Sequence, residues 1–83
     1  MQIQTVSVEK SASINIAVFS VDKVQVTVGH LLRVGKWNVV VENGSHKAFR
    51  GMGKLFDSAD HAIAAYKQSS IKAALVEAKQ LLS

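Results

Sequence analysis

The first half of the chain consists of short runs rich in β-branched residues, which predict strands. Apolar and polar side chains alternate over Val24–Val28 and Trp37–Glu42, the period-two pattern of a strand with one buried face. Ile14–Ser20 is apolar at both parities, as expected of a strand that is covered on both faces. Ile3–Val8 predicts a shorter first strand, and a fifth is expected over roughly His46–Phe56.

Glycine positions suggest how these strands are connected. Gly29 predicts a bulge in the third strand, which we expect to continue toward Val34. Gly35–Lys36 fits a two-residue type II′ turn, which would pair Val34 with Trp37 on one face of the sheet. Asn43–Gly44 fits a type I′ turn, in which both central residues take positive φ. The expected strands are therefore joined as antiparallel hairpins.

The last third of the chain changes to a helical period. Asp57 or Ser58 is suited to cap the start of a helix, and Ser70 is suited to cap a second one. Two apolar stripes at helical spacing follow these caps: Ala59, Ala62, Ile63 and Tyr66, then Ile71, Ala74, Leu75, Ala78 and Leu82. We therefore expect an α+β fold in which an antiparallel sheet of four to five strands (residues ~2–56) precedes two short helices (~58–68 and ~70–82) packed on one face.

Composition limits the class of protein. The chain has 83 residues, 48% of them hydrophobic, with no cysteine and no proline. This length suits a single domain, residues 1–83, whose apolar core must form without disulfides or cysteine zinc sites. No apolar run approaches the roughly 18 residues of a membrane span, and the first residues lack the pattern of a secretory signal. A cytoplasmic location, in a bacterial or host cell, and no membrane partner are expected.

The net charge of +4 is concentrated in the middle of the chain. Residues 1–29 and 55–83 each contain equal numbers of acidic and basic side chains. Residues 30–54 hold five lysines and arginines against Glu42 alone, an excess of four that equals the whole net charge. A basic stretch of this kind attracts an acidic partner without identifying it.

The sequence gives little support for catalysis or for metal binding. Asp57, Asp60 and His61 form the best acid–base cluster, but carboxylates are common at helix starts because they complement the helix dipole. The spacing of His30, His46 and His61 matches no zinc pattern. We expect no enzyme activity, no catalytic residues, no metal site and no cofactor.

A glycine-containing stretch, Arg50–Lys54, resembles a phosphate-binding loop only superficially. It has two glycines rather than the spacing of a P-loop or a dinucleotide fingerprint. A backbone nest between Arg50 and Lys54 would still suit a phosphate. The alternative that we favour is a glycine bulge that bends the fifth strand.

The basic middle predicts a partner-binding surface. Its candidate residues are the five lysines and arginines of this stretch and two aromatic residues that lie among them: Arg33, Lys36, Trp37, Lys47, Phe49, Arg50 and Lys54. Cations with aromatics suit nucleic acid, where they contact phosphates and stack on bases, and they suit protein interfaces equally. The structural alternative is a polar rim around a core tryptophan, because Trp37 shares its parity with Val39 and Val41.

Two short motifs carry a resemblance. Asn15–Phe19 reads Asn-Ile-Ala-Val-Phe, and Lys54–Ser58 reads Lys-Leu-Phe-Asp-Ser. In both, the chain resembles small phage-encoded anti-CRISPR proteins with a four-stranded antiparallel sheet and two short helices. The resemblance implies a non-enzymatic inhibitor that occupies a CRISPR effector complex and blocks target DNA, and it assigns no contact residues here.

The sequence thus favours a small non-enzymatic interaction protein, an anti-CRISPR-like inhibitor from a phage or mobile element. Its basic hairpins would bind a protein or nucleoprotein partner. The alternative is a small basic nucleic-acid-binding module that uses the same surface. A homodimer is a further expectation, because helices on one face of the sheet leave Val40 and its neighbours facing outward.

Overall fold

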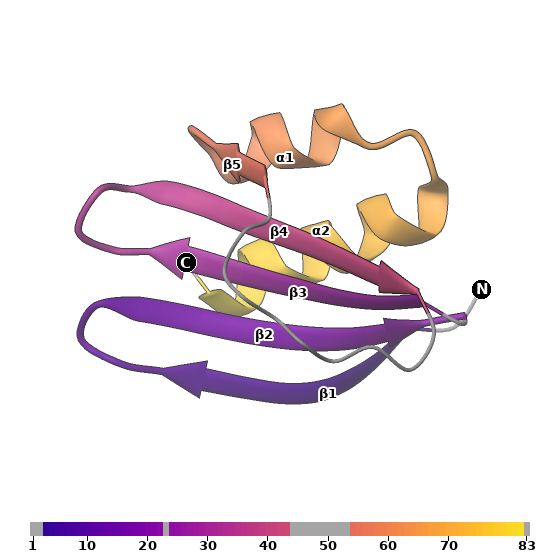
Figure 1. Ribbon diagram of the computed structural model, residues 1–83, viewed down its shortest axis with the longest axis horizontal. Helices are drawn as coiled ribbons and strands as arrows, with labels where there is room; N and C mark the ends of the chain where they lie inside the picture. The colour runs from indigo at the N-terminus through magenta and orange to yellow at the C-terminus, as the bar shows by residue number, and fades with distance from the viewer. Residues whose placement is uncertain (1–2, 23, 44–53, 83) are drawn as a thin grey trace.

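The computed structural model describes residues 3–22, 24–43 and 54–82. Its sheet contains five antiparallel strands in the sequential order β1-β2-β3-β4-β5. They are β1 (Ile3–Lys10), β2 (Ile14–Val21), β3 (Val24–Leu31), β4 (Lys36–Asn43) and β5 (Lys54–Phe56). Two helices follow, α1 (Ala59–Ala65) and α2 (Ser69–Leu82), and both pack on the same face of the sheet (Figure 1). The expected α+β architecture is confirmed.

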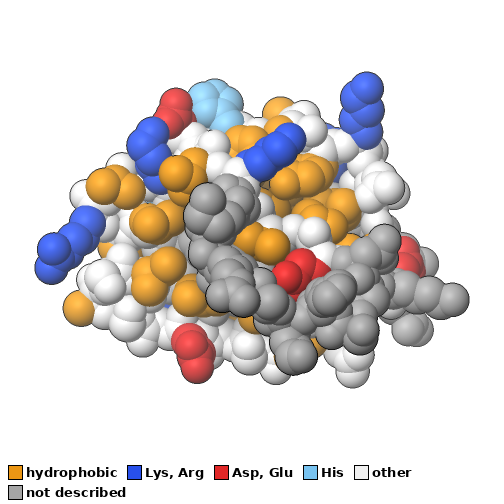
Figure 2. Space-filling view, in the orientation of Figure 1, with side chains coloured by type: hydrophobic (Ala, Val, Ile, Leu, Met, Phe, Trp, Pro, Cys, Tyr) orange, Lys and Arg blue, Asp and Glu red, His pale blue; other side chains and the backbone are white. Residues whose placement is uncertain are grey.

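Alternation along the strands determines which side chains reach the helices. Phe19 lies opposite Val26, and Val26 opposite Val41, so these residues share the helix-covered face. Neighbouring residues such as Val18, Thr27 and Val40 point to the other face, which we call the open face because neither α1 nor α2 covers it, although Thr27 is buried there. In Figure 2 hydrophobic side chains are spread over the side of the molecule that carries this open face.

The core forms between the helix-covered face and the apolar stripes of the two helices. The apolar stripe that the helical spacing predicts for α2 is buried throughout: Ile71, Ala74, Leu75, Ala78 and Leu82. The two alanines have 0% exposure, and side chains this small let the helix backbone lie close to β2 and β3. The radius of gyration, 11.5 Å, is near the roughly 12 Å of a compact chain of this length.

Ser58 and Gln68 provide the helix starts. The Ser58 side chain accepts a hydrogen bond from the backbone N–H of His61 at 3.1 Å, so Ser58 rather than Asp57 caps α1. The first backbone bond of α2 runs from Lys72 N–H to the Gln68 carbonyl, 3.0 Å, which places Ser70 inside the helix. The prediction of Ser70 as a cap was therefore wrong, because the helix begins at Ser69, two residues earlier than a Ser70 cap requires.

The bulge in the sheet lies in β1 and not at Gly29. Gly29 pairs with Ile16 and Asn38 without a register shift, so the predicted bulge in β3 was wrong. A β-carbon at Gly29 would lie 3.4 Å from Ile14 Cδ1, an ordinary contact distance, so packing on the open face does not require a glycine there. The shift occurs between Thr5 and Ser7, where Val6 is an extra residue.

Candidate interaction surface at the hairpin end

Two hairpin turns lie side by side at one end of the sheet, which we call the hairpin end (residues 11–13 and 32–36; Figure 1). The β3–β4 turn contains four residues, Leu32–Gly35, between the paired Leu31 and Lys36. The predicted two-residue turn was wrong: His30, not Val34, lies opposite Trp37. The turn closes through a 2.8 Å bond from Gly35 N–H to the Leu31 carbonyl.

Hydrogen bonds hold both turns in place. Ser11 and Ile14 bond reciprocally across the β1–β2 turn: Ser11 N–H donates to the Ile14 carbonyl at 3.0 Å, and Ile14 N–H donates to the Ser11 hydroxyl oxygen at 3.2 Å. The two turns are joined by Leu32 N–H donating to the Ser13 carbonyl at 3.0 Å. Because its backbone is fixed at three points, the hairpin end binds a partner with little further loss of backbone entropy.

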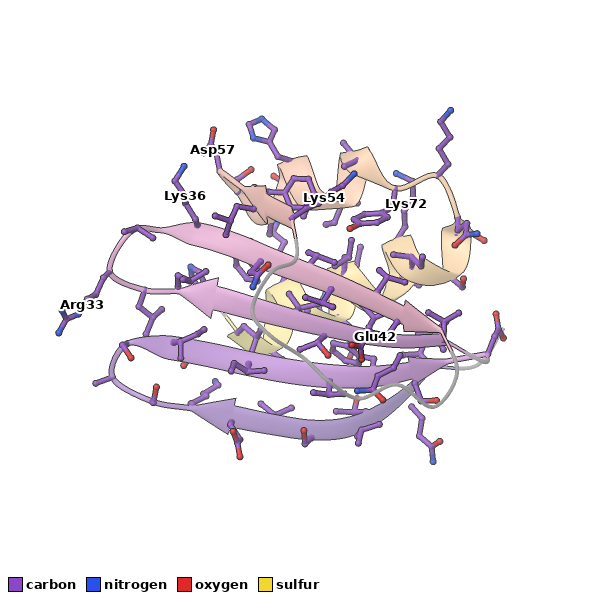
Figure 3. The ribbon with its side chains drawn as sticks, viewed as in Figure 1. Arg33, Lys36, Glu42, Lys54, Asp57 and Lys72 are labelled. Carbon is purple, nitrogen blue, oxygen red and sulfur yellow. The ribbon has the colours of Figure 1, made fainter. Side chains whose placement is uncertain are left out.

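The β3–β4 turn exposes apolar side chains on either side of a cation. Leu32 is 40% exposed, and Val34 is 63% exposed, the largest exposure of a large apolar side chain in the described residues. Arg33 lies between them and projects from the end of the sheet (Figure 3). Leu32 and Val34 were not predicted as site residues, because a run of apolar residues before Gly35 reads as the continuation of a strand.

Lys36 is already engaged within the protein. Its ammonium donates to the Asp57 carboxylate at 2.6 Å and joins the start of β4 to the segment between β5 and α1 (Figure 3). This hydrogen bond, together with the charge of Lys36, lowers the pKa of Asp57 below its ordinary value. A partner would have to compete with Asp57 for Lys36, and Arg33 is the better candidate for an intermolecular ion pair.

Trp37 belongs to the core. It is 6% exposed, and its ring stacks on His30 with centroids 4.1 Å apart and planes 10° apart. A side chain so covered has no free face on which a nucleic-acid base could stack. The burial agrees with the alternative of a core tryptophan, and it does not support a partner-binding role for Trp37.

Lys54 lies apart from the hairpin end. It pairs with Val39, three residues along β4 from Lys36, which is about 10 Å of strand. Its side chain is exposed above β5, whereas Arg33 projects from the end of the sheet (Figure 3). Lys47, Phe49 and Arg50 lie outside the described residues.

The acidic and histidine clusters form ion pairs and caps. Asp57 bonds Lys36, and Asp60 bonds Lys79 at 2.8 Å, an interaction that also lowers the pKa of Asp60. His61 is exposed beside the Ser58 cap. Within residues 3–22, 24–43 and 54–82, no group of three acidic or histidine side chains is arranged to hold a metal ion.

Comparisons with protein-family models, curated proteins and solved structures found no match to this chain. Neither of the two described helices is long and apolar enough to cross a membrane. The geometry of the described residues therefore carries the functional argument.

Proposed function

We propose that this protein is a non-enzymatic binding protein whose hairpin end contacts an acidic surface of a partner protein or nucleoprotein in the cytoplasm. One observation carries the proposal: Arg33 lies between the exposed Leu32 and Val34 on a turn that is fixed by hydrogen bonds. Arginine is enriched at protein interfaces, and the buried centre of an interface is apolar, so an exposed arginine beside exposed apolar side chains suits a protein partner.

The same observation makes a protein surface a better partner than bare nucleic acid. Phosphates are bound by cations and hydrogen-bond donors, and they offer nothing to Leu32 and Val34. The tryptophan that would provide a stacking platform is 6% exposed. A nucleic-acid-binding module that uses the basic middle of the chain is the competing function.

The resemblance to anti-CRISPR proteins leads us to propose a narrower version. In it, the protein is a phage or mobile-element inhibitor, and the hairpin end occupies an acidic site on a CRISPR effector complex. This version rests on the motifs at Asn15–Phe19 and Lys54–Ser58, and it needs a separate test.

The test compares three single variants with the wild type: Arg33→Glu, Val34→Ser and Lys67→Glu. Lys67 is exposed between the two helices, so it provides a charge-matched control away from the hairpin end. The assay measures target-DNA binding by a panel of purified CRISPR effector complexes with each variant added. We expect inhibition of one complex to be lost with Arg33→Glu, weakened with Val34→Ser and kept with Lys67→Glu.

A salt titration with a fluorescent single- or double-stranded oligonucleotide tests the competing function. Direct nucleic-acid binding requires that log K falls linearly with log salt, with a slope set by the number of phosphates contacted. We expect no binding of the oligonucleotide at low salt. Tight, salt-dependent binding that Arg33→Glu weakens would replace the protein-partner proposal with the nucleic-acid module.

A further inference from the structure

The outer edge of β1 is a long strand edge whose protective features are the bulge at Val6 and the charges of Glu9 and Lys10 at its end. All residues of β1 from Gln4 to Lys10 are exposed, and β1 is the first strand in the sheet order. Residues 3–8 contain no charge and no proline, although natural edge strands often carry one or the other. The opposite edge strand, β5, is only three residues long. The β1 edge is therefore suited to accept another strand.

The bulge at Val6 gives β1 a symmetrical pattern of faces. Before the bulge, Ile3 and Thr5 lie opposite Val21 and Phe19 of the helix-covered face. After the bulge, the residues on that face are Val8 and Lys10, which lie opposite Ala17 and Asn15. The positions on the helix-covered face are therefore symmetrical about the midpoint between Val6 and Ser7. Thr5 and Val8 lie equally far from this midpoint along the chain, and so do Ile3 and Lys10.

We propose that β1 pairs antiparallel with β1 of a second copy of this chain, about a twofold axis between Val6 and Ser7. In this register Ile3 of one copy lies opposite Lys10 of the other, and Thr5 opposite Val8. The two residues of each pair then lie on the same face of a continuous sheet. In an unbulged strand the faces alternate strictly, so this overlap of all eight residues would pair residues from opposite faces.

The backbone groups match in the same register. Residues on the helix-covered face of β1 all oppose alternate residues of β2, so their N–H and C=O groups all point to one side of the strand. Each such residue therefore meets, across the axis, a residue whose backbone groups have the same orientation. Where these groups face the partner, the N–H of one copy meets the C=O of the other, so a ladder can form on either side of the bulge.

The side chains of β1 favour a second copy of this chain as the partner. Glu9 meets the neutral Gln4 of the other copy, and Lys10 meets Ile3, so no like charges face each other. Thr5 and Val8 form a pair of β-branched residues, which stabilises strand pairing. The first 29 residues carry no net charge, so the +4 of the chain opposes this approach only weakly.

A charge-exchange experiment tests the interface and its register. T5K/V8K places lysines opposite each other at both pairs, and T5E/V8E does the same with glutamates. Each variant alone should be monomeric, whereas an equimolar mixture should form a heterodimer in which every pair is complementary. Q68K/Q80K, which adds the same charge at exposed positions in the helical part of the chain, should dimerise like the wild type.

Sedimentation equilibrium from about 10 µM to about 1 mM gives the readout, because strand-edge dimers are small interfaces and dissociate on dilution. We expect the wild-type dimer fraction to rise over this range, and the association constant to fall at least about tenfold in each charge variant, a change of about 1.4 kcal/mol. If T5K/V8K fails to fold, Q4K/E9K provides the same repulsion on the open face through exposed positions.

Three results would overturn the proposal. They are a wild type that stays monomeric at the highest concentration, a dimer that survives the folded lysine variants, and a mixture of opposite variants that fails to dimerise. Arg33→Glu should leave the dimer intact, so the failure of this inference and the failure of the proposed function can be told apart.

Discussion

His30 and Trp37 lie opposite each other on β3 and β4 and stack with their ring centroids 4.1 Å apart. The pair occupies the helix-covered face beside the end of α2, where His30 Nδ1 is 3.0 Å from the Leu82 carbonyl. An aromatic pair thus closes the core at the same end of the sheet that carries the exposed Arg33. Trp37 is buried and His30 is half-buried, so the pair joins the hairpin end to the core.

We predict that Trp37→Ala destabilises the protein by about 3–5 kcal/mol, the range for removal of a large buried aromatic. Trp37→Phe should cost less, because it keeps a ring against His30. Urea denaturation followed by circular dichroism measures both variants. A loss below about 1 kcal/mol for Trp37→Ala would contradict the assignment of Trp37 to the core and reopen its role as a surface anchor.

Two side chains from the sheet bind the last described carbonyl of α2, that of Leu82. The Asn15 side-chain amide donates to it at 3.2 Å, and His30 Nδ1 lies 3.0 Å away. Asn15→Ala or His30→Phe should each cost about 0.5–1.5 kcal/mol, with the phenylalanine keeping the stack on Trp37.

The double variant Asn15→Ala/His30→Phe should cost more than the sum of the single variants, because only then does Leu82 O lose both partners. A double-mutant cycle from denaturant unfolding measures this coupling. Simple additivity would show that the two bonds contribute independently. Faster amide exchange in the last turn of α2 should accompany the loss.

Gly29 and Gly35 differ in what an added β-carbon would meet. Gly35 takes φ +69, a left-handed conformation that costs other residues about 1–2 kcal/mol, although nothing lies within 4 Å of the added atom. Gly29 has no positive φ, and its added atom would make an ordinary contact with Ile14. Gly35→Ala should therefore destabilise the protein by about 1–2 kcal/mol, and Gly29→Ala by clearly less. The reverse order in thermal denaturation would contradict the geometry of the β3–β4 turn.

Periodicity alone was sufficient to predict the fold class. Alternation over Trp37–Glu42 and the helical stripe ending at Leu82 each specify one apolar face, and burying those faces leaves a helix layer on a sheet. The prediction from Gly29 was wrong because glycine is typical of a bulge, whereas the pairing of Gly29 with Ile16 and Asn38 continues without a register shift.

The candidate site was harder to predict, because charge in the sequence does not reveal pairing. Lys36 and Arg33 are equivalent as charges in the basic middle, but only the fold places Asp57 against Lys36. Leu32 and Val34 continue the apolar pattern of a strand, and their exposure follows from the four-residue turn. The β1 symmetry depends on a bulge for which the sequence has no glycine signal.

The pairs Lys36–Asp57 and Lys79–Asp60 predict a dependence of stability on acidic pH. Both carboxyl groups have a lowered pKa in the folded protein. Their contribution is therefore fully present above the unfolded pKa of about 3.9 and is lost as the pH falls through the folded value. This contribution is measured by thermal unfolding of the wild type and of the Asp57→Asn and Asp60→Asn variants between about pH 7 and about pH 2.

The difference in melting temperature between wild type and each variant should shrink below about pH 4. It should also shrink in high salt, because both pairs are exposed and screened. A difference that stays constant across this pH range would show that the carboxylates are unpaired in solution.

Tyr66 predicts that the stability of the protein depends on pH in the alkaline range. Its ring meets Phe56 edge-on with centroids 6.2 Å apart, and burial raises the pKa of its phenol. Since the folded pKa lies above the unfolded one, the stabilisation is fully present below about pH 10 and is lost as the pH rises through the folded value. Tyr66 is the only tyrosine of the chain, so phenolate absorbance reports on it directly. We expect its titration midpoint to move down to the ordinary tyrosine range in urea, whereas an unchanged midpoint would contradict the packing of Tyr66 against Phe56.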